Sequence, residues 1–161
     1  MSKFTHINPS GHAAMVDVQH KAATQRTAMA QSMVELPAEV LTELLQANNT
    51  LQSPKGSVFQ TAVLAGIMAA KKTGDLIPLC HPIGLDNCHV DIHLNESQHV
   101  VITCTATVFS KTGVEMEALV GASIAALTVY DMCKALSHDI VIRDTKLISK
   151  TGGKRDFRRT S

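Results

Sequence analysis

The chain has 161 residues, a formal net charge of +1 and few aromatic side chains, with no Trp, one Tyr and four Phe. This length suits one domain with its own hydrophobic core. The near-zero charge offers no basic excess for a nucleic acid or an anionic membrane surface, and the shortage of aromatics argues against stacking on bases.

Two further features concern compartment and metals. We find no run as long as a transmembrane span, and the polar start of the chain is not a signal peptide, so a cytoplasmic location is predicted. There are four cysteines: Cys80, Cys88, Cys104 and Cys133. They form no C-x-x-C pair, and adjacent Cys and His residues rarely point at one metal ion. We therefore predict reduced, mostly buried thiols, no metal site, and no nucleic-acid or membrane partner.

The first half of the chain alternates between loops and regular elements. Residues 1–12 are predicted to be a flexible segment, and the apolar run at 15–18 could be an edge strand. Residues 21–36 are ambiguous, because their Ala and Met content favours a helix whereas their alternation fits a strand. Pro37 suits a first helical position, and apolar spacing predicts helices over 38–47 and 58–70, joined by a loop at 53–57.

A rigid segment follows at 75–82, where Pro78 and Pro82 stiffen the backbone around His81. Taken alone, His81 fits a structural loop histidine better than a functional one. Residues 90–94 and 100–108 alternate between apolar and polar side chains, which predicts a hairpin of two strands, and a last strand is predicted over 139–149.

The stretch Lys111–Leu136 predicts a long helix that is apolar nearly all round. Glu115 and Glu117 suit the positive end of its dipole, and Lys134 suits the negative end. Such a helix must be buried on every side, which in a short chain favours a second subunit against its outer face. Asp131 and Lys134 lie three residues apart on one face, as either an ordinary surface ion pair or a catalytic acid/base pair.

The order strand, helix, strand, strand, helix, strand predicts an α+β fold, a ferredoxin-like split βαβ sandwich with an antiparallel sheet packed with helices. One domain is expected over 13–154, followed by a basic tail at 155–161. The glycine-containing end of the chain is either a frayed terminus or a phosphate grip, in which the N–H groups of Gly152 and Gly153 approach an anion.

Two motifs resemble one known family. The first motif lies in the stretch of the long helix, where residues 111–119 read Lys-Thr-Gly-Val-Glu-Met-Glu-Ala-Leu and residues 130–135 read Tyr-Asp-Met-Cys-Lys-Ala. The second motif is the rigid segment at residues 75–82, which reads Asp-Leu-Ile-Pro-Leu-Cys-His-Pro. Both closely resemble the MoaC family, the cyclic pyranopterin monophosphate synthases of molybdenum-cofactor biosynthesis. The resemblance extends over nearly the whole chain and favours a strand within 21–36. It ends after Lys154, where the family usually reads Ser-Gly and this chain reads Arg155-Asp156.

The resemblance implies a lyase. Its substrate would be (8S)-3′,8-cyclo-7,8-dihydroguanosine 5′-triphosphate, and its products cyclic pyranopterin monophosphate and diphosphate. No cofactor is implied, although Mg²⁺ could accompany the triphosphate. The implied assembly is a homohexamer, a trimer of dimers. The implied catalytic residues are Asp131 and Lys134. The implied substrate-binding residues are Leu79, Cys80, His81, Met116 and Glu117, with basic positions around the triphosphate at Lys55, Lys150, Lys21 and Arg26.

Helix geometry adds one inference about the active site. Glu117 and Asp131 are fourteen residues apart, so their Cα atoms would lie about 21 Å apart along one helix. One small substrate is unable to touch both, and a neighbouring subunit could complete each pocket. The rival interpretation is a nucleotide-binding module without turnover, which would not need the Asp131/Lys134 pair. A purely structural oligomer would not need the His81 loop.

Overall fold

The computed structural model describes residues 5–46, 52–53 and 56–160. Its elements in chain order are β1 (Thr24–Glu35), α1 (Ala38–Gln46), β2 (Gln52–Ser53), β3 (Gly56–Ser57), α2 (Val58–Lys71), α3 (Thr73–Leu76), β4 (Asn87–Leu94), β5 (Val100–Ser110), α4 (Glu115–Cys133), β6 (Val141–Thr151) and β7 (Phe157–Arg158).

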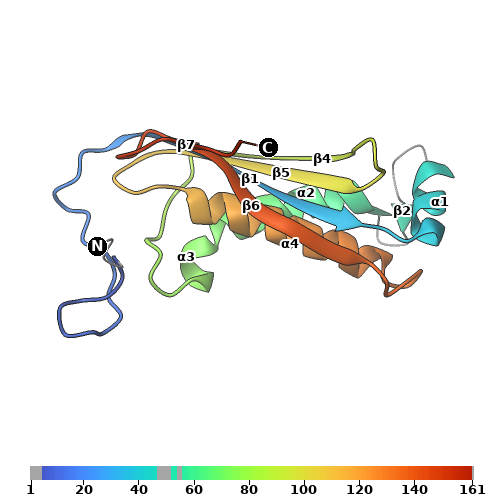
Figure 1. The fold of residues 1–161 in the computed structure, drawn as a ribbon, viewed down its shortest axis with the longest axis horizontal. Coiled ribbons are helices and arrows are strands. Elements are labelled where there is room, and N and C mark those ends of the chain that lie inside the picture. Colours follow the sequence, from blue (N-terminus) through green and yellow to red (C-terminus); the bar gives the residue numbers. More distant parts are fainter. Residues whose placement is uncertain (1–4, 47–51, 54–55, 161) are drawn as a thin grey trace.

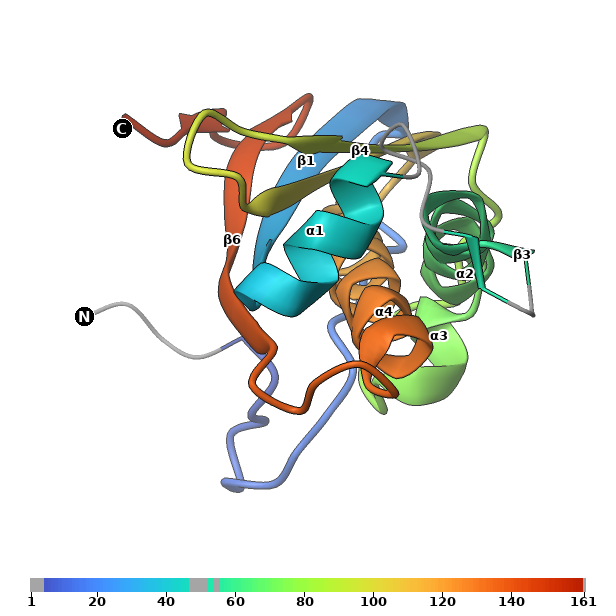
Figure 2. The same cartoon turned by 90° about the vertical axis from the view of Figure 1, so that its right-hand side faces the viewer.

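Five strands form one sheet in the order β4-β5-β1-β6-β7, and every neighbouring pair is antiparallel. Helices α2 and α4 run side by side against one face of this sheet (Figures 1 and 2). Strands β2 and β3 form a separate short pair. The prediction of an α+β fold is confirmed. The narrower assignment to the ferredoxin-like class stays a prediction.

The ambiguous stretch at 21–36 forms β1, the strand that pairs with β5 on one side and β6 on the other. Its residues Ala28, Ala30, Ser32 and Val34 are buried toward the helices. Because these side chains are small, α4 can lie close to the sheet. The Ser32 hydroxyl shares a 2.8 Å hydrogen bond with the Thr145 hydroxyl, so this buried polar group is satisfied. Pairing on both edges thus outweighs the helical propensity of the Ala and Met residues.

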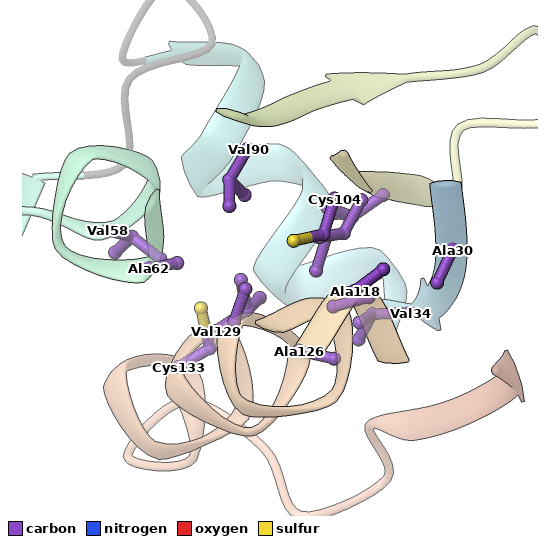
Figure 3. Close-up of a cluster of buried hydrophobic side chains, with 14 of the residues drawn as sticks. Ala30, Val34, Val58, Ala62, Val90, Cys104, Ala118, Ala126, Val129 and Cys133 are labelled. Atoms are coloured by element: carbon purple, nitrogen blue, oxygen red, sulfur yellow. The ribbon is translucent and has the colours of Figure 1, made fainter. Parts of the chain in front are cut away.

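The core lies between the sheet and helices α2 and α4. Figure 3 shows Ala62 of α2, Val90 and Cys104 of the sheet, and Ala118 and Val129 of α4 gathered around it. Most of these side chains are small, so the two helices approach each other closely, and the aromatic residues Phe59 and Tyr130 are only partly buried against this cluster.

The two helices approach each other closely at Gly66 of α2 and Gly121 of α4. A Cβ atom added at Gly66 would lie 2.9 Å from the carbonyl oxygen of Gly121, which is backbone and has little freedom to move. Alanine in place of Gly66 should therefore force α2 and α4 apart, although alanine itself favours the helix by about 1 kcal/mol.

We expect Gly66→Ala to lower the free energy of unfolding by about 1–2 kcal/mol net, because the overpacking exceeds the gain in helix propensity. Urea unfolding followed by circular dichroism would measure this. Gly84→Ala is the matched control, since a Cβ atom at Gly84 meets nothing within 4 Å. Equal midpoints for Gly66→Ala and the unmodified protein would contradict the close packing of these helices.

Helix α4 is apolar over most of its length, between Glu117 and Asp131, but one chain covers only part of its surface. By length and composition it could cross a membrane, so the statement that no run reaches that length is wrong. In this fold it packs against the sheet and α2, with eight of its residues buried. Its outer residue Leu127 is 52% exposed, and Leu64 and Met68 of α2 are 62% and 56% exposed. The expected burial on every side is therefore not achieved within one chain.

Two smaller expectations change at the ends of the chain. Residues 15–18 form no strand, and the short pairing nearby is instead an isolated bridge between Ile7 and Ala13. In the basic tail, Phe157 and Arg158 form β7, which pairs with β6 and extends the sheet by one short strand. The interpretation of a frayed terminus is therefore wrong for these two residues.

Candidate functional site

Two cavities meet at the N-terminal end of α4. The first, here called the basic cavity, has a volume of 230 Å³ and is lined by Lys21, Arg26, Thr27, Gly113, Val114, Glu115, Lys150, Thr151, Gly153 and Lys154. The second, here called the His81 cavity, has a volume of 310 Å³ and is lined by His6, Leu79, Cys80, His81, Ile83, Thr112, Gly113, Glu115, Met116 and Glu117. Gly113 and Glu115 line both, so the two cavities adjoin.

The sheet brings these segments together. Strand β5 ends at Ser110 opposite Thr24, the first residue of β1, and β6 ends at Thr151 opposite Thr27. The turn from β5 into α4 therefore lies beside the start of β1 and the end of β6. The segment after α3 supplies His81 from the other side of this turn. Segments far apart in the sequence thus share one site because antiparallel pairing brings their ends to the same edge.

An ion pair stands where the two cavities meet. The Lys150 ammonium donates a hydrogen bond to a Glu115 carboxylate oxygen at 2.7 Å. Burial raises the pKa of Glu115, but the bond from Lys150, a backbone N–H and the charges of Lys150 and Arg26 outweigh it and hold the pKa below its ordinary value. Glu115 is therefore ionised at neutral pH. Gly113 makes room for it, since a Cβ atom at Gly113 would collide with this carboxylate.

A second carboxyl group, that of Glu117, has the opposite character. The residue is only 3% exposed, and burial raises the pKa of its carboxyl, with the charge of Glu115 adding to the rise against a lowering backbone hydrogen bond. Burial likewise raises the pKa of the neighbouring Cys80 thiol, helped by the charge of Glu117. The His81 cavity thus holds a carboxyl group that takes up a proton more readily than a free Glu, which suits proton transfer to or from a ligand.

We expect Glu117→Gln to raise the melting temperature at pH 7 by a few degrees, because it removes the cost of burying an ionised carboxylate. The pKa of Glu117 is higher in the folded protein than in the unfolded chain. The cost of burying the ionised carboxylate is therefore present at pH values above the folded-state pKa and disappears at pH values below the pKa of the unfolded chain. The gain should accordingly shrink to nothing as the pH falls below about 4.5. Thermal unfolding across this pH range measures it. A variant less stable than the unmodified protein at pH 7 would contradict the pKa shift.

The Gly152–Gly153 segment lies beside the basic cavity, which Gly153 lines, but it differs from the phosphate grip that was one of its two interpretations. Gly152 has a φ of +81°, and a Cβ atom there would collide with the Gln25 carbonyl group. Its N–H donates to a carboxylate oxygen of Asp156 at 3.1 Å, and its carbonyl oxygen accepts from the Thr24 hydroxyl at 2.7 Å. The Gly152 N–H is therefore engaged within the chain, and the expected two-residue phosphate grip is wrong for this group.

The Asp131–Lys134 pair lies at the other end of α4. Their side chains form a 2.7 Å ion pair, with the Asp131 and Lys134 side chains both about half exposed. The hydrogen bond and charge of Asp131 raise the pKa of Lys134. Sixteen residues separate Glu115 from Asp131, about 24 Å along the helix. Figure 1 shows α4 lying lengthwise in the molecule, with its first turns near α3 and its last turns toward the right-hand side. One chain therefore does not bring this pair to the cavities.

The remaining predicted site residues fall into two groups. Leu79, Cys80, His81, Met116 and Glu117 line the His81 cavity, whereas Lys21, Arg26 and Lys150 line the basic cavity. Lys55 lies outside the described residues. Within the described part of the chain, no group of three or more His, Cys, Asp or Glu side chains is placed to hold a metal ion. The roles of all these residues stay predictions.

Sequence reasoning missed some residues of the site, chiefly Glu115 and Lys154. Glu115 was assigned only to the helix dipole, and no local pattern links it to Lys150, which is 35 residues away. Lys154 was noted only as the last residue covered by the family resemblance, yet it lines the basic cavity. A usable signal was the lysine spacing around Gly152–Gly153, which brackets the loop on both sides.

Comparisons with known proteins identify the family to which the chain is similar. The sequence model of the MoaC family matches residues 15–153. A cyclic pyranopterin monophosphate synthase from Xanthomonas campestris pv. campestris (strain 8004) is 52% identical over 156 residues, covering 97% of this chain and 93% of that protein. Molybdenum cofactor biosynthesis protein 1 from Dictyostelium discoideum is 48% identical over 168 residues, covering 95% of this chain and 27% of that protein. The chain belongs to the MoaC family.

Proposed function

We propose that the protein is a lyase that converts the cyclised dihydroguanosine triphosphate to cyclic pyranopterin monophosphate and diphosphate, an early step of molybdenum-cofactor biosynthesis. The observation that carries the proposal is the junction of the two cavities at Gly113 and Glu115. One side of the junction supplies cations, and the other supplies a histidine and a carboxyl group with a raised pKa. A ligand with a triphosphate at one end and a heterocycle at the other matches this division.

The basic cavity takes the triphosphate. Lys21, Arg26 and Lys150 line it, and Lys55 is proposed to join them. Release of diphosphate places negative charge on the departing oxygen, and fixed cations stabilise that charge as it develops. A Mg²⁺ ion, where present, would enter with the triphosphate as part of the substrate, and the proposal includes no resident cofactor.

The His81 cavity takes the purine-derived ring. Its Leu79 and Met116 offer apolar contacts, and His81 offers a hydrogen bond that orients the ring, together with the nearby Cys80 and Glu117. Opening the guanine-derived ring and closing the pterin requires protons to move on and off nitrogen and oxygen. Glu117 is suited to one of these transfers because burial raises its pKa above that of a free Glu.

Asp131 and Lys134 act as the acid/base pair, and they reach the cavities from a neighbouring subunit of a homohexamer built as a trimer of dimers. Two observations support this part of the proposal. The pair lies too far from the cavities of its own chain, and the exposed apolar side chains of Leu64, Met68 and Leu127 offer a surface for another copy. Burial against a partner would lower the pKa of Lys134 by desolvation, toward the range of a general acid or base.

The test is to incubate the purified protein with the cyclised dihydroguanosine triphosphate in metal-free buffer. Pterin fluorescence after oxidation and released diphosphate should appear together, and both should be lost in Asp131→Asn. Tight binding with neither product would instead identify a nucleotide-binding module without turnover. The cytoplasmic location stays a prediction.

A further inference from the structure

Arg26 makes contacts that its charge alone does not require. Its Nε donates a hydrogen bond to the Ser110 carbonyl oxygen at 2.9 Å, and its Nη2 donates to the Lys111 carbonyl oxygen at 3.2 Å. These two carbonyls belong to consecutive residues at the end of β5 and the start of the turn into α4. The guanidinium group therefore holds the backbone of this turn with two of its three nitrogen atoms.

The turn that Arg26 holds carries the junction of the two cavities. After Lys111 the chain passes through Gly113 to Glu115, both of which line both cavities. Helix α4 begins there without help from a side-chain cap, because its N-cap residue is Val114. The start of α4 thus depends on contacts made by residues outside it, and Arg26 makes two of these contacts.

The remaining nitrogen of Arg26 faces the other wall of the basic cavity. A Cβ atom added at Gly153 would lie 3.3 Å from Nη1, so the guanidinium group lies between the turn and the Gly152–Gly153 segment. The charge of Arg26 also helps to hold the pKa of Glu115 low. One side chain therefore contacts the turn and lies close to the glycine segment and to the carboxylate that marks the junction.

We infer that Arg26 is a positioning residue, which fixes the Lys111–Glu115 turn so that the junction between the cavities keeps its shape. Its catalytic consequence rests on the proposed function, whereas its effect on the turn does not. The planar guanidinium group presents several donors in a fixed arrangement, while a lysine presents one flexible ammonium group. Charge at this position is therefore not enough, and lysine is a poor substitute.

The test compares Arg26→Lys, Arg26→Met and the unmodified protein by amide hydrogen exchange and by kinetics. We expect both variants to exchange the amides of residues 111–115 at least tenfold faster, with the amides of β4 unchanged. For Arg26→Lys, which keeps the positive charge, we also expect kcat to fall roughly 10- to 100-fold with a smaller change in KM, because a small displacement at a reacting centre can cost this much. Arg26→Met should show the same fall in kcat and, because it removes a cation from the basic cavity, also a higher KM. A purely structural defect would not divide the two constants in this way.

Lys21→Met is the matched control, since it removes a positive charge from the same cavity and leaves the two carbonyl contacts of Arg26 in place. It should raise KM and leave exchange of residues 111–115 unchanged. Arg26→Lys with the exchange and kcat of the unmodified protein would overturn the inference, and so would an equal loss of protection in β4. If the unmodified protein made no product, the proposed function would fail, and hydrogen exchange would still decide the role of Arg26.

Discussion

Replacing Lys134 by alanine is expected to reduce the rate of turnover by about 10²–10⁴-fold while the protein still folds and assembles. The side chain is half exposed, and among the described residues its ion pair is with the neighbouring Asp131, so the fold loses little without it. An exposed ion pair of this kind is screened by water and contributes little to stability. A large kinetic loss with a small loss of stability would therefore identify a catalytic role and exclude an ordinary surface pair.

The measurement is the rate of diphosphate release, with thermal unfolding and size-exclusion chromatography on the same sample. Lys72→Ala is the matched control, because Lys72 is also exposed and is also the C-cap residue of its helix, in this case α2. This control should retain the rate of the unmodified protein, since Lys72 lines neither cavity. A near-normal rate in Lys134→Ala would remove this residue from the mechanism and leave Glu117 as the acid/base group with the best support.

The fold was predictable wherever local pattern and burial agree. Alternation in β4 and β5, and the apolar spacing of α1 and α2, follow from which face of each element is covered. The strand β1 was not predictable from propensity, because its stability comes from pairing with partners about 75 and 120 positions further along the chain. The prediction for the run at 15–18 failed for the same reason, since none of the described strands pairs with it.

The site was predictable in composition and less so in arrangement. The two motifs contain most residues of the His81 cavity, so a sequence pattern suffices to collect them. The ion pair between Glu115 and Lys150 needs the tertiary fold, since it joins α4 to β6. The hydrogen bond from the Gly152 N–H to the Asp156 side chain could not be predicted for a different reason, because it forms only when the loop turns back on itself. Asp131 lies too far from the cavities of its own chain, so an active site that uses both requires a second chain.

The sharpest consequence of that distance is that two inactive variants should restore activity when mixed. His81→Ala damages the cavity, and Lys134→Ala damages the acid/base pair at the far end of α4. If each active site combines a cavity from one chain with a pair from another, random mixing in equal amounts leaves about one quarter of the sites with both parts intact. If each site lies within one chain, every site stays damaged, and no activity returns.

The experiment unfolds the two variants together, refolds them, and measures diphosphate release, with native mass spectrometry to verify that mixed oligomers have formed. Asp131→Asn mixed with Lys134→Ala is the control, because both substitutions damage the same helix end and no combination of chains repairs it. Verified mixed oligomers without recovered activity would contradict a shared site and return the pair to the role of a surface ion pair. Recovery in the first mixture and none in the second is expected only if Asp131 and Lys134 of one chain serve the cavities of another chain. Within one chain, about 24 Å of helix α4 separates Glu115 at the cavities from Asp131, so any mechanism that uses both the cavities and the pair requires two chains.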